Sequence, residues 1–113
     1  MKLLVTGGRD YKDQHLVTKT LNQARQKFGE FLLIQGGAPG ADTLARNWAV
    51  SHGYPCATFH APWTALGKPA GMRRNGWMLE YGQPDLVVAF PGGPGTAGMI
   101  SLAEAAGVKV VRI

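Results

Sequence analysis

The stretch DLVVAFPGGPGT, residues 85–96, decides the fold class. Its first half, 85–90, is a short apolar run rich in β-branched residues, which is typical of a strand buried on both faces. A glycine-rich loop follows, and a helical pattern then runs from Thr96 to Ala106. A buried strand, a glycine loop and a helix in this order indicate an α/β protein with a parallel sheet.

The same unit recurs along the whole chain. We predict strands over residues 2–6, 31–35, 54–59, 85–90 and 108–113. We predict helices between Asp13 and Gly29, between Asp42 and Gly53, over 70–80 and over 96–106, with a loop over 60–68. In the first helix, Asp13 is the expected N-cap and Gly29 the expected stop. The inner face of that helix is predicted to carry Leu16, Val17, Leu21, Ala24 and Phe28.

Strict alternation of strands and helices leaves few topologies, because parallel crossovers are right-handed. We predict an α/β fold: a single Rossmann-like three-layer domain over residues 1–113, with a five-stranded parallel sheet of order 3-2-1-4-5. The winding direction of this sheet reverses between strands 1 and 4. Ligands of such folds bind in the crevice at the carboxyl ends of the strands that flank this point.

Composition places the chain among ordinary soluble proteins, with 45% hydrophobic and 17% charged residues. Its single cysteine, Cys56, excludes an internal disulfide and a cysteine-rich zinc site, and is predicted to be a core side chain. Met1 leads directly into a strand, and no apolar run approaches the roughly 18 residues of a membrane span, so we expect a cytoplasmic protein. The net charge of +5 favours anionic partners.

The 16 glycines are clustered at the ends of three predicted strands rather than scattered. The loop 91–96 is predicted to bind phosphate, because glycines turn backbone N–H groups toward one point and a helix adds its positive end. Its expected ligand-binding residues are Gly92, Gly93, Gly95 and Thr96. The Thr96 hydroxyl either contacts the phosphate or caps the helix. The alternative for the whole loop is a tight turn that happens to need glycine.

Two further loops are expected to meet this one. After the first strand come Gly7, Gly8 and Arg9, and the arginine either binds the ligand or forms an ion pair with Asp10 or Asp13. After the second strand come Gly36, Gly37, Gly40 and Asp42. Asp42 either caps the second helix or binds a ribose hydroxyl.

Arg74 and Asn75, near the start of the third long helix, are candidates to close over a phosphate or base. The sequence lacks a Walker A ending and a Gly-x-Gly-x-x-Gly fingerprint after the first strand, so neither that kind of ATP hydrolysis nor an NAD cofactor is expected. His15, His52 and His60 lack metal-ligand spacing, and only His60 has a chance of reaching the crevice. Trp63 either stacks on a base or packs down its loop.

Four motifs together resemble the YspA-like branch of the SLOG superfamily. They are residues 5–11 (VTGGRDY), 36–42 (GGAPGAD), 70–78 (AGMRRNGWM) and 88–96 (VAFPGGPGT). The resemblance covers nearly the whole chain and implies a Rossmann-like fold. The superfamily also contains the Lonely Guy phosphoribohydrolases and the DNA-processing protein A family. The resemblance implies a ligand among nucleotides, ADP-ribose derivatives or nucleic acid, and a homodimer.

The sequence departs from the enzymatic branch at the positions of two glutamates, which are Gly98 and Met99 here. Cleavage of an N-glycosidic bond needs a carboxylate to stabilise charge or activate water. Asp10 and Asp42 are weak substitutes, and Glu80 and Glu104 are expected to face solvent. We therefore expect a nucleotide-binding or sensing module, with a nucleotide or ADP-ribose hydrolase and a single-stranded DNA binder as alternatives.

Overall fold

The computed structural model describes residues 1–113 and confirms the predicted α/β fold. The strands are β1 Lys2–Thr6, β2 Leu32–Gln35, β3 Cys56–Thr58, β4 Leu86–Ala89 and β5 Lys109–Arg112. The helices are α1 Gln14–Phe28, α2 Ala41–Ser51, α3 Trp63–Leu66, α4 Ala70–Glu80 and α5 Pro94–Ala105. None of the helices is long and apolar enough to cross a membrane.

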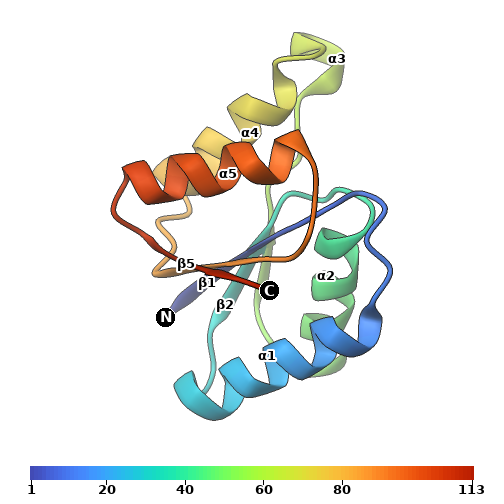
Figure 1. Ribbon diagram of the computed structural model, residues 1–113, viewed down its shortest axis with the longest axis vertical. Helices are drawn as coiled ribbons and strands as arrows, with labels where there is room; N and C mark the ends of the chain where they lie inside the picture. The colour runs from blue at the N-terminus through green and yellow to red at the C-terminus, as the bar shows by residue number, and fades with distance from the viewer.

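The five strands form one sheet in the order β3-β2-β1-β4-β5, as predicted, and every neighbouring pair is parallel. In the centre, Leu4 of β1 pairs with Ile34 of β2 and with Val87 of β4. Helices α1 and α2 lie on one side of the sheet and α4 and α5 on the other (Figure 1). The carboxyl ends of β1 and β4 are therefore adjacent at the point where the winding reverses.

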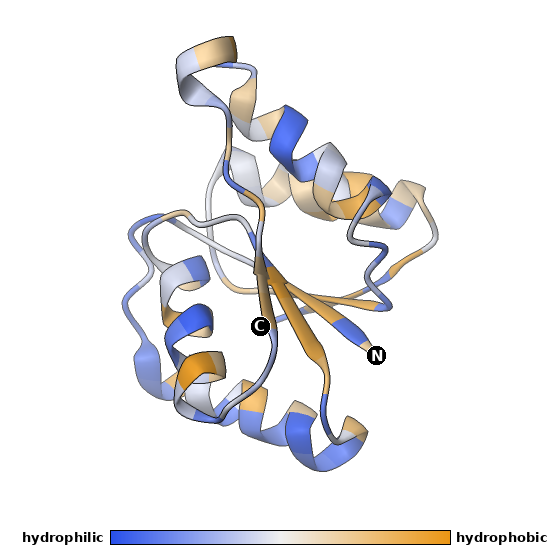
Figure 2. Cartoon of the chain, turned by 180° about the vertical axis from the view of Figure 1, so that it is seen from behind, coloured by the Kyte–Doolittle hydropathy of each residue, from blue (hydrophilic) through white to orange (hydrophobic).

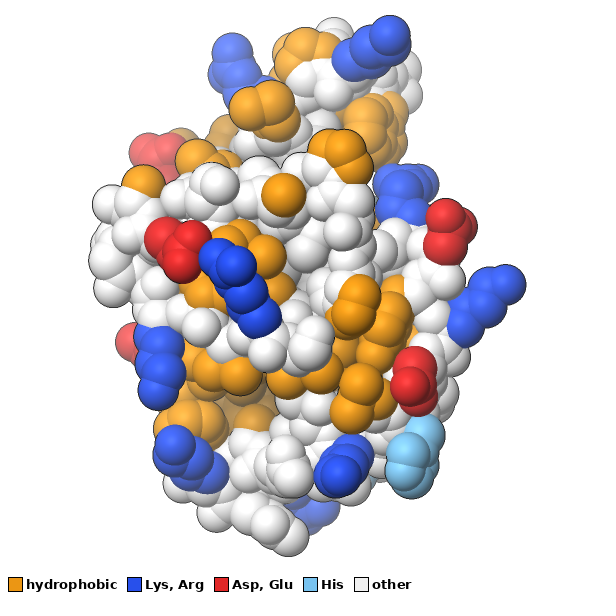
Figure 3. All heavy atoms as spheres, in the orientation of Figure 1, with side chains coloured by type: hydrophobic (Ala, Val, Ile, Leu, Met, Phe, Trp, Pro, Cys, Tyr) orange, Lys and Arg blue, Asp and Glu red, His pale blue; other side chains and the backbone are white.

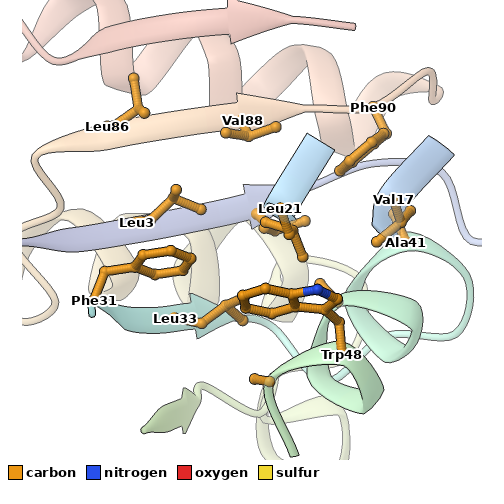
Figure 4. Packing of buried hydrophobic residues seen from close by; sticks show 13 residues of the cluster. Leu3, Val17, Leu21, Phe31, Leu33, Ala41, Trp48, Leu86, Val88 and Phe90 are labelled. Atoms are coloured by element: carbon orange, nitrogen blue, oxygen red, sulfur yellow. The ribbon is translucent and has the colours of Figure 1, made fainter. Parts of the chain in front are cut away.

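Alternate residues of the strands build two cores, one on each face of the sheet. Leu3 and Val5 point into a cluster of 13 buried residues under α1 and α2, while Leu4 joins a cluster of six under α4 and α5. Figure 4 shows the larger cluster, in which the rings of Phe31 and Trp48 stack with their centroids 5.8 Å apart. The strands are apolar along most of their length, and hydrophilic residues occur mainly on the helices and loops (Figure 2).

Helix α1 follows its sequence signals closely. The Asp13 side chain accepts a hydrogen bond from the Leu16 N–H at 3.0 Å, and Gly29 ends the helix at a φ of 73°. Of the predicted inner face, Val17 and Leu21 are fully buried, but Phe28 is 37% exposed.

Two of the differences from the predicted elements have identifiable reasons. Helix α5 begins at Pro94 rather than Thr96, because proline lacks an N–H and has a φ suited to the first helical position. The expected loop over 60–68 contains the short helix α3, which begins after Pro62 and ends at Gly67 with a φ of 61°.

Candidate functional site

The loops that follow β1 and β4 are bound directly to each other. The Gly8 N–H donates to the Pro91 carbonyl oxygen at 2.9 Å. A Cβ on Gly8 would lie 3.0 Å from that oxygen and 3.2 Å from the Gly92 Cα, so the two backbones are in close contact. We call residues 7–10, 91–96 and Arg74 the switch-point site.

The loop after β4 presents backbone donors that the protein itself does not use. The N–H groups of Gly92, Gly93, Gly95 and Thr96 donate to no group of the protein, and the first intrahelical bond of α5 runs from Ala97 to Gly93. Pro94 has no N–H. Gly92, Gly93 and Gly95 are exposed to solvent. Free N–H groups together with the positive end of a helix dipole make a position that favours an anion.

The three glycines of this loop have different reasons to be glycine. A Cβ on Gly92 would overlap the Thr96 hydroxyl and lie 2.6 Å from the Gly8 nitrogen, so packing inside the protein excludes a side chain there. By contrast, no atom lies within 4 Å of a Cβ placed on Gly93 or Gly95. Nothing in the protein requires glycine at these two positions, which border open space.

Thr96 is buried and is the third residue of α5, and Gly93 is the N-cap. The alternative that Thr96 caps the helix is therefore wrong, because the helix begins two residues earlier than predicted. Its hydroxyl packs against Gly92.

The glycine loop after β2 differs from the loop after β4, because the N–H groups of its residues 36–38 all donate hydrogen bonds to side chains of the protein. Gly36 and Ala38 donate to the Asp42 carboxylate at 3.1 Å and 3.3 Å, and Gly37 donates to the Gln35 side-chain oxygen at 2.6 Å. Gly40, at a φ of 81°, lies so close to the backbone of Gly8 that no side chain fits. This loop forms a rigid wall and offers no free donor over residues 36–38.

Asp42 occupies the second position of α2 and is 6% exposed. The predicted N-cap role is wrong, because Gly40 is the N-cap and the carboxylate turns back to the loop. Burial raises the pKa of Asp42, while the loop N–H groups and the nearby guanidinium groups of Arg74 and Arg9 oppose that rise.

Two arginines converge on this carboxylate from separate elements. The Arg74 guanidinium donates to the Gly36 carbonyl oxygen, and its Nε donates to the Asn75 side-chain oxygen at 3.1 Å. Burial lowers the pKa of Arg74, and the charge of Arg9 lowers it further, against the opposing effect of Asp42. Two guanidinium groups beside one carboxylate leave the cluster with a net positive charge.

Arg9 is exposed and forms neither a hydrogen bond nor an ion pair. The alternative that it pairs with Asp10 or Asp13 is therefore wrong, since the single ion pair of the protein joins Arg112 to Glu104. Arg9 remains available to an anionic ligand.

Asn75 connects α4 to the loop after β4. Its side chain is 6% exposed and its Nδ2 donates to the Gly95 carbonyl oxygen at 3.3 Å. The structure thus brings together Arg9, Arg74 and Asn75 with both central loops. Asp10 is exposed and has no hydrogen-bonded partner.

Three other side chains bear on the site. The His60 ring lies against Gly37, in keeping with its expected position near the crevice. Trp63 is 50% exposed on α3, where its ring edge lies close to Gly71. Gln35, which sequence reasoning missed, is fully buried and donates to the Thr58 hydroxyl at 2.5 Å while it holds Gly37. A polar residue ending an apolar strand was the signal that could have identified it.

The sequence profile of the YspA, cpYpsA-related SLOG family matches residues 1–65, which carry the loops after β1 and β2. The chain belongs to this family. Gene 61 protein of Mycobacterium phage D29 is 34% identical to it, and the alignment covers 98% of this chain and 94% of that protein. The family resemblance predicted from the four motifs is thus confirmed.

Three solved structures share the fold of this SLOG chain. TM1055, a structural genomics target, has a TM-score of 0.74 and 22% identity over 96% of this chain and 71% of its own. The Moco Carrier Protein of Chlamydomonas reinhardtii has a TM-score of 0.67 and 21% identity over 99% and 75%. DNA processing protein A of Streptococcus pneumoniae has a TM-score of 0.53 and 19% identity over 97% and 58%. At these identities the likeness concerns the fold alone.

Proposed function

We propose that the switch-point site binds the phosphate of a nucleotide or nucleotide-derived ligand, and that the protein acts as a binding or sensing module. The observation that carries this proposal is the set of four unused N–H groups over Gly92–Thr96, with the unpaired Arg9 on the neighbouring loop. Backbone donors at a helix start and a free guanidinium are the groups that proteins use for phosphate.

Open space at Gly93 and Gly95 supports the same proposal. A phosphate held by backbone N–H groups must approach the chain more closely than a Cβ allows. Glycine at two exposed positions without any crowding from the protein is explained by such an approach.

Hydrolysis of the ligand is less well supported than binding. The Asp42 carboxylate is buried and already accepts two backbone N–H groups, so it is poorly placed to activate water. Asp10 is exposed, in surroundings without the burial that would make it a general acid. Gly98 and Met99 supply no carboxylate.

Nucleic-acid binding remains the competing function, since one structural neighbour is a DNA processing protein. It would require basic residues gathered along one surface. On the face shown in Figure 3 the lysines and arginines are spread apart, with no continuous basic stripe. On this face the distribution favours a small phosphate ligand over an extended nucleic acid.

The test is a comparison of AMP, adenosine, ADP-ribose and inorganic phosphate by thermal unfolding and calorimetry. A ligand present at 100 times its Kd stabilises the native state by about 2.7 kcal/mol. We expect AMP and ADP-ribose to raise the Tm and adenosine to have little effect, because adenosine lacks the phosphate. Equal stabilisation by AMP and adenosine would refute a phosphate-directed site. Binding of single-stranded DNA alone, weakening steeply with salt, would favour the nucleic-acid alternative.

A further inference from the structure

A groove of about 440 Å³ lies between α1 and β5, reaching the amino ends of the strands, away from the switch-point site. Seven of its 12 lining residues are hydrophobic. The apolar side chains that form its floor and walls are Ala24, Phe28, Leu86, Val88, Val111 and Ile113. Figure 3 shows a recessed apolar area beside blue, basic side chains on the face that α1 and β5 share.

This part of the sheet lacks the cover that a parallel sheet needs on both faces. Helices α1 and α2 pack over the central strands, while α5 packs on β5 from the other side. In consequence Phe28, Val111 and Ile113 are 37%, 36% and 39% exposed. The groove runs beside α1 over two adjacent strands, β4 and β5, which is the position where α/β folds place a helix.

The charged side chains at the rim of the groove are mostly basic. Lys27 lies over the Phe28 ring, with its Nζ 5.4 Å from the centroid, and Lys109 lines the opposite side. Neither lysine forms an ion pair. The one acidic lining residue, Asp85, already accepts a hydrogen bond from the Lys2 N–H at 2.8 Å.

We infer that this groove binds an amphipathic α-helix of another protein, with carboxylates flanking the apolar face of that helix. Apolar anchors at helical spacing would fill the space over β4 and β5. Acidic side chains beside them would complement Lys27 and Lys109, which gives the complex its specificity and orientation.

The charge of the chain argues against a second copy of itself as the occupant. Five other apolar residues on helices are exposed, namely Val50, Trp63, Leu66, Met72 and Leu102. Three of them, Trp63, Leu66 and Met72, form the largest group, on α3 and α4, and lie close in sequence to Lys68 and Arg73. Docking of that basic surface onto the lysines of the groove would bring like charges together. A partner of opposite sign is therefore favoured.

The test uses two fluorescent stapled helical peptides that share leucines at i, i+3, i+4 and i+7. One peptide has glutamates at the flanking positions and the other has lysines. We expect the intact protein to bind the glutamate peptide about tenfold more tightly, because each lysine of the second peptide faces a lysine of the rim. Amide chemical shifts in an NMR titration should change at Ala24, Val88 and Val111.

Two protein variants sharpen the test. Val111→Glu places a carboxylate in the groove and should abolish binding, whereas Val50→Glu, at a 65% exposed position on α2, should not. Reversing the rim with Lys27→Glu and Lys109→Glu together should make the protein prefer the lysine peptide. Circular dichroism checks that each variant is folded.

The inference is overturned by any of three results: no saturable binding of the glutamate peptide, equal affinity for both peptides, or binding that Val111→Glu leaves unchanged. Sedimentation velocity supplies a fourth. If the protein dimerises and Val111→Glu alone makes it monomeric, the groove belongs to a second copy, which would also agree with the dimer expected from the family resemblance.

Discussion

The backbone N–H of Gly8 donates to the carbonyl oxygen of Pro91 over 2.9 Å, and this bond joins the loops after the two central strands. A side chain at Gly8 would separate them, since its Cβ would lie 3.0 Å from that oxygen. The bond fixes the position of Arg9 relative to the free N–H groups that follow Pro91. The geometry proposed for phosphate binding thus depends on contact between two loops that are more than 80 residues apart in sequence.

The first prediction separates two neighbouring glycines of the loop 91–96. Gly92→Ala should lower the free energy of unfolding by about 1–3 kcal/mol, because its Cβ would overlap Thr96 and crowd Gly8. Gly93→Ala should cost less, about 0.5–1 kcal/mol, because its Cβ meets no atom and only the preference of the N-cap for glycine over alanine is lost, yet it should weaken AMP binding. Urea denaturation and calorimetry measure the two effects. Unchanged AMP affinity in Gly93→Ala would count against the proposed phosphate position.

The second prediction concerns the unpaired guanidinium of Arg9. Arg9→Gln should weaken AMP binding by about 10- to 100-fold, the equivalent of one charged hydrogen bond of roughly 1.5–3 kcal/mol. Stability should stay the same, because Arg9 is exposed and bonds to no other residue. Arg25→Gln, an exposed arginine on α1, is the matched control and should bind normally. Equal losses in both variants would indicate that only the overall charge matters.

The sequence was sufficient to predict the five strands with their order in the sheet and the four long helices, but not the short helix α3. Buried strands such as 85–90 have continuous apolar runs, and right-handed crossovers then leave few ways to arrange them. Those two constraints also predict that Gly7–Arg9 lies opposite Gly92–Thr96. Local sequence signals also predicted a helix end correctly where a single residue sets it, as Asp13 does at the start of α1.

The sequence did not indicate which acceptor each N–H group of the glycine loops would bond to. The loops 36–40 and 91–96 look alike as glycine-rich segments, but in the first the N–H groups of residues 36–38 all bond to side chains of the protein, whereas those of Gly92, Gly93, Gly95 and Thr96 are free. The difference arises from Gln35 and Asp42, whose side chains turn into the first loop because Gly40 takes the N-cap position. Such an arrangement depends on tertiary packing against Gly8, which no local pattern encodes.

The third prediction is a pH dependence that comes from Asp42. Because burial raises its pKa in the folded protein above the value of 3.8, the folded state binds the proton more tightly than the unfolded state. Asp42 therefore stabilises the fold most below that value, and this stability is lost as the pH rises through the raised pKa. Relative to Asp42→Asn, the wild-type protein should lose stability as the pH rises from about 4 through the raised pKa of Asp42.

Chemical denaturation of the wild-type protein and of Asp42→Asn at a series of pH values above about 4 measures the difference between their free energies of unfolding. The other carboxylates are the same in both proteins, so their contributions cancel in this difference. Arg74→Gln should move the loss to higher pH, because the Arg74 charge opposes the rise in the Asp42 pKa. A constant difference between wild type and Asp42→Asn at every pH would contradict the prediction.

The fourth prediction concerns Gly98 and Met99, the positions at which the sequence departs from the glutamates expected in the enzymatic branch of the superfamily. Met99 is fully buried in the core under α4 and α5, so Met99→Glu should destabilise the protein by about 3–5 kcal/mol through an unpaired buried charge. Met99→Leu, the control for size, should cost less than about 1.5 kcal/mol. Gly98→Glu should be tolerated, since no atom lies within 4 Å of its Cβ and glutamate favours a helix more than glycine does.

Unfolding in urea compares the three variants directly. If Met99→Glu proved as stable as Met99→Leu, α5 could turn its second-turn side chains toward the ligand, and the case against hydrolysis would weaken. With Met99 held in the core, restoring a glutamate pair is incompatible with the packing of α5 on the sheet. AMP incubated with the wild-type protein should therefore remain intact, with no release of adenine detected by chromatography.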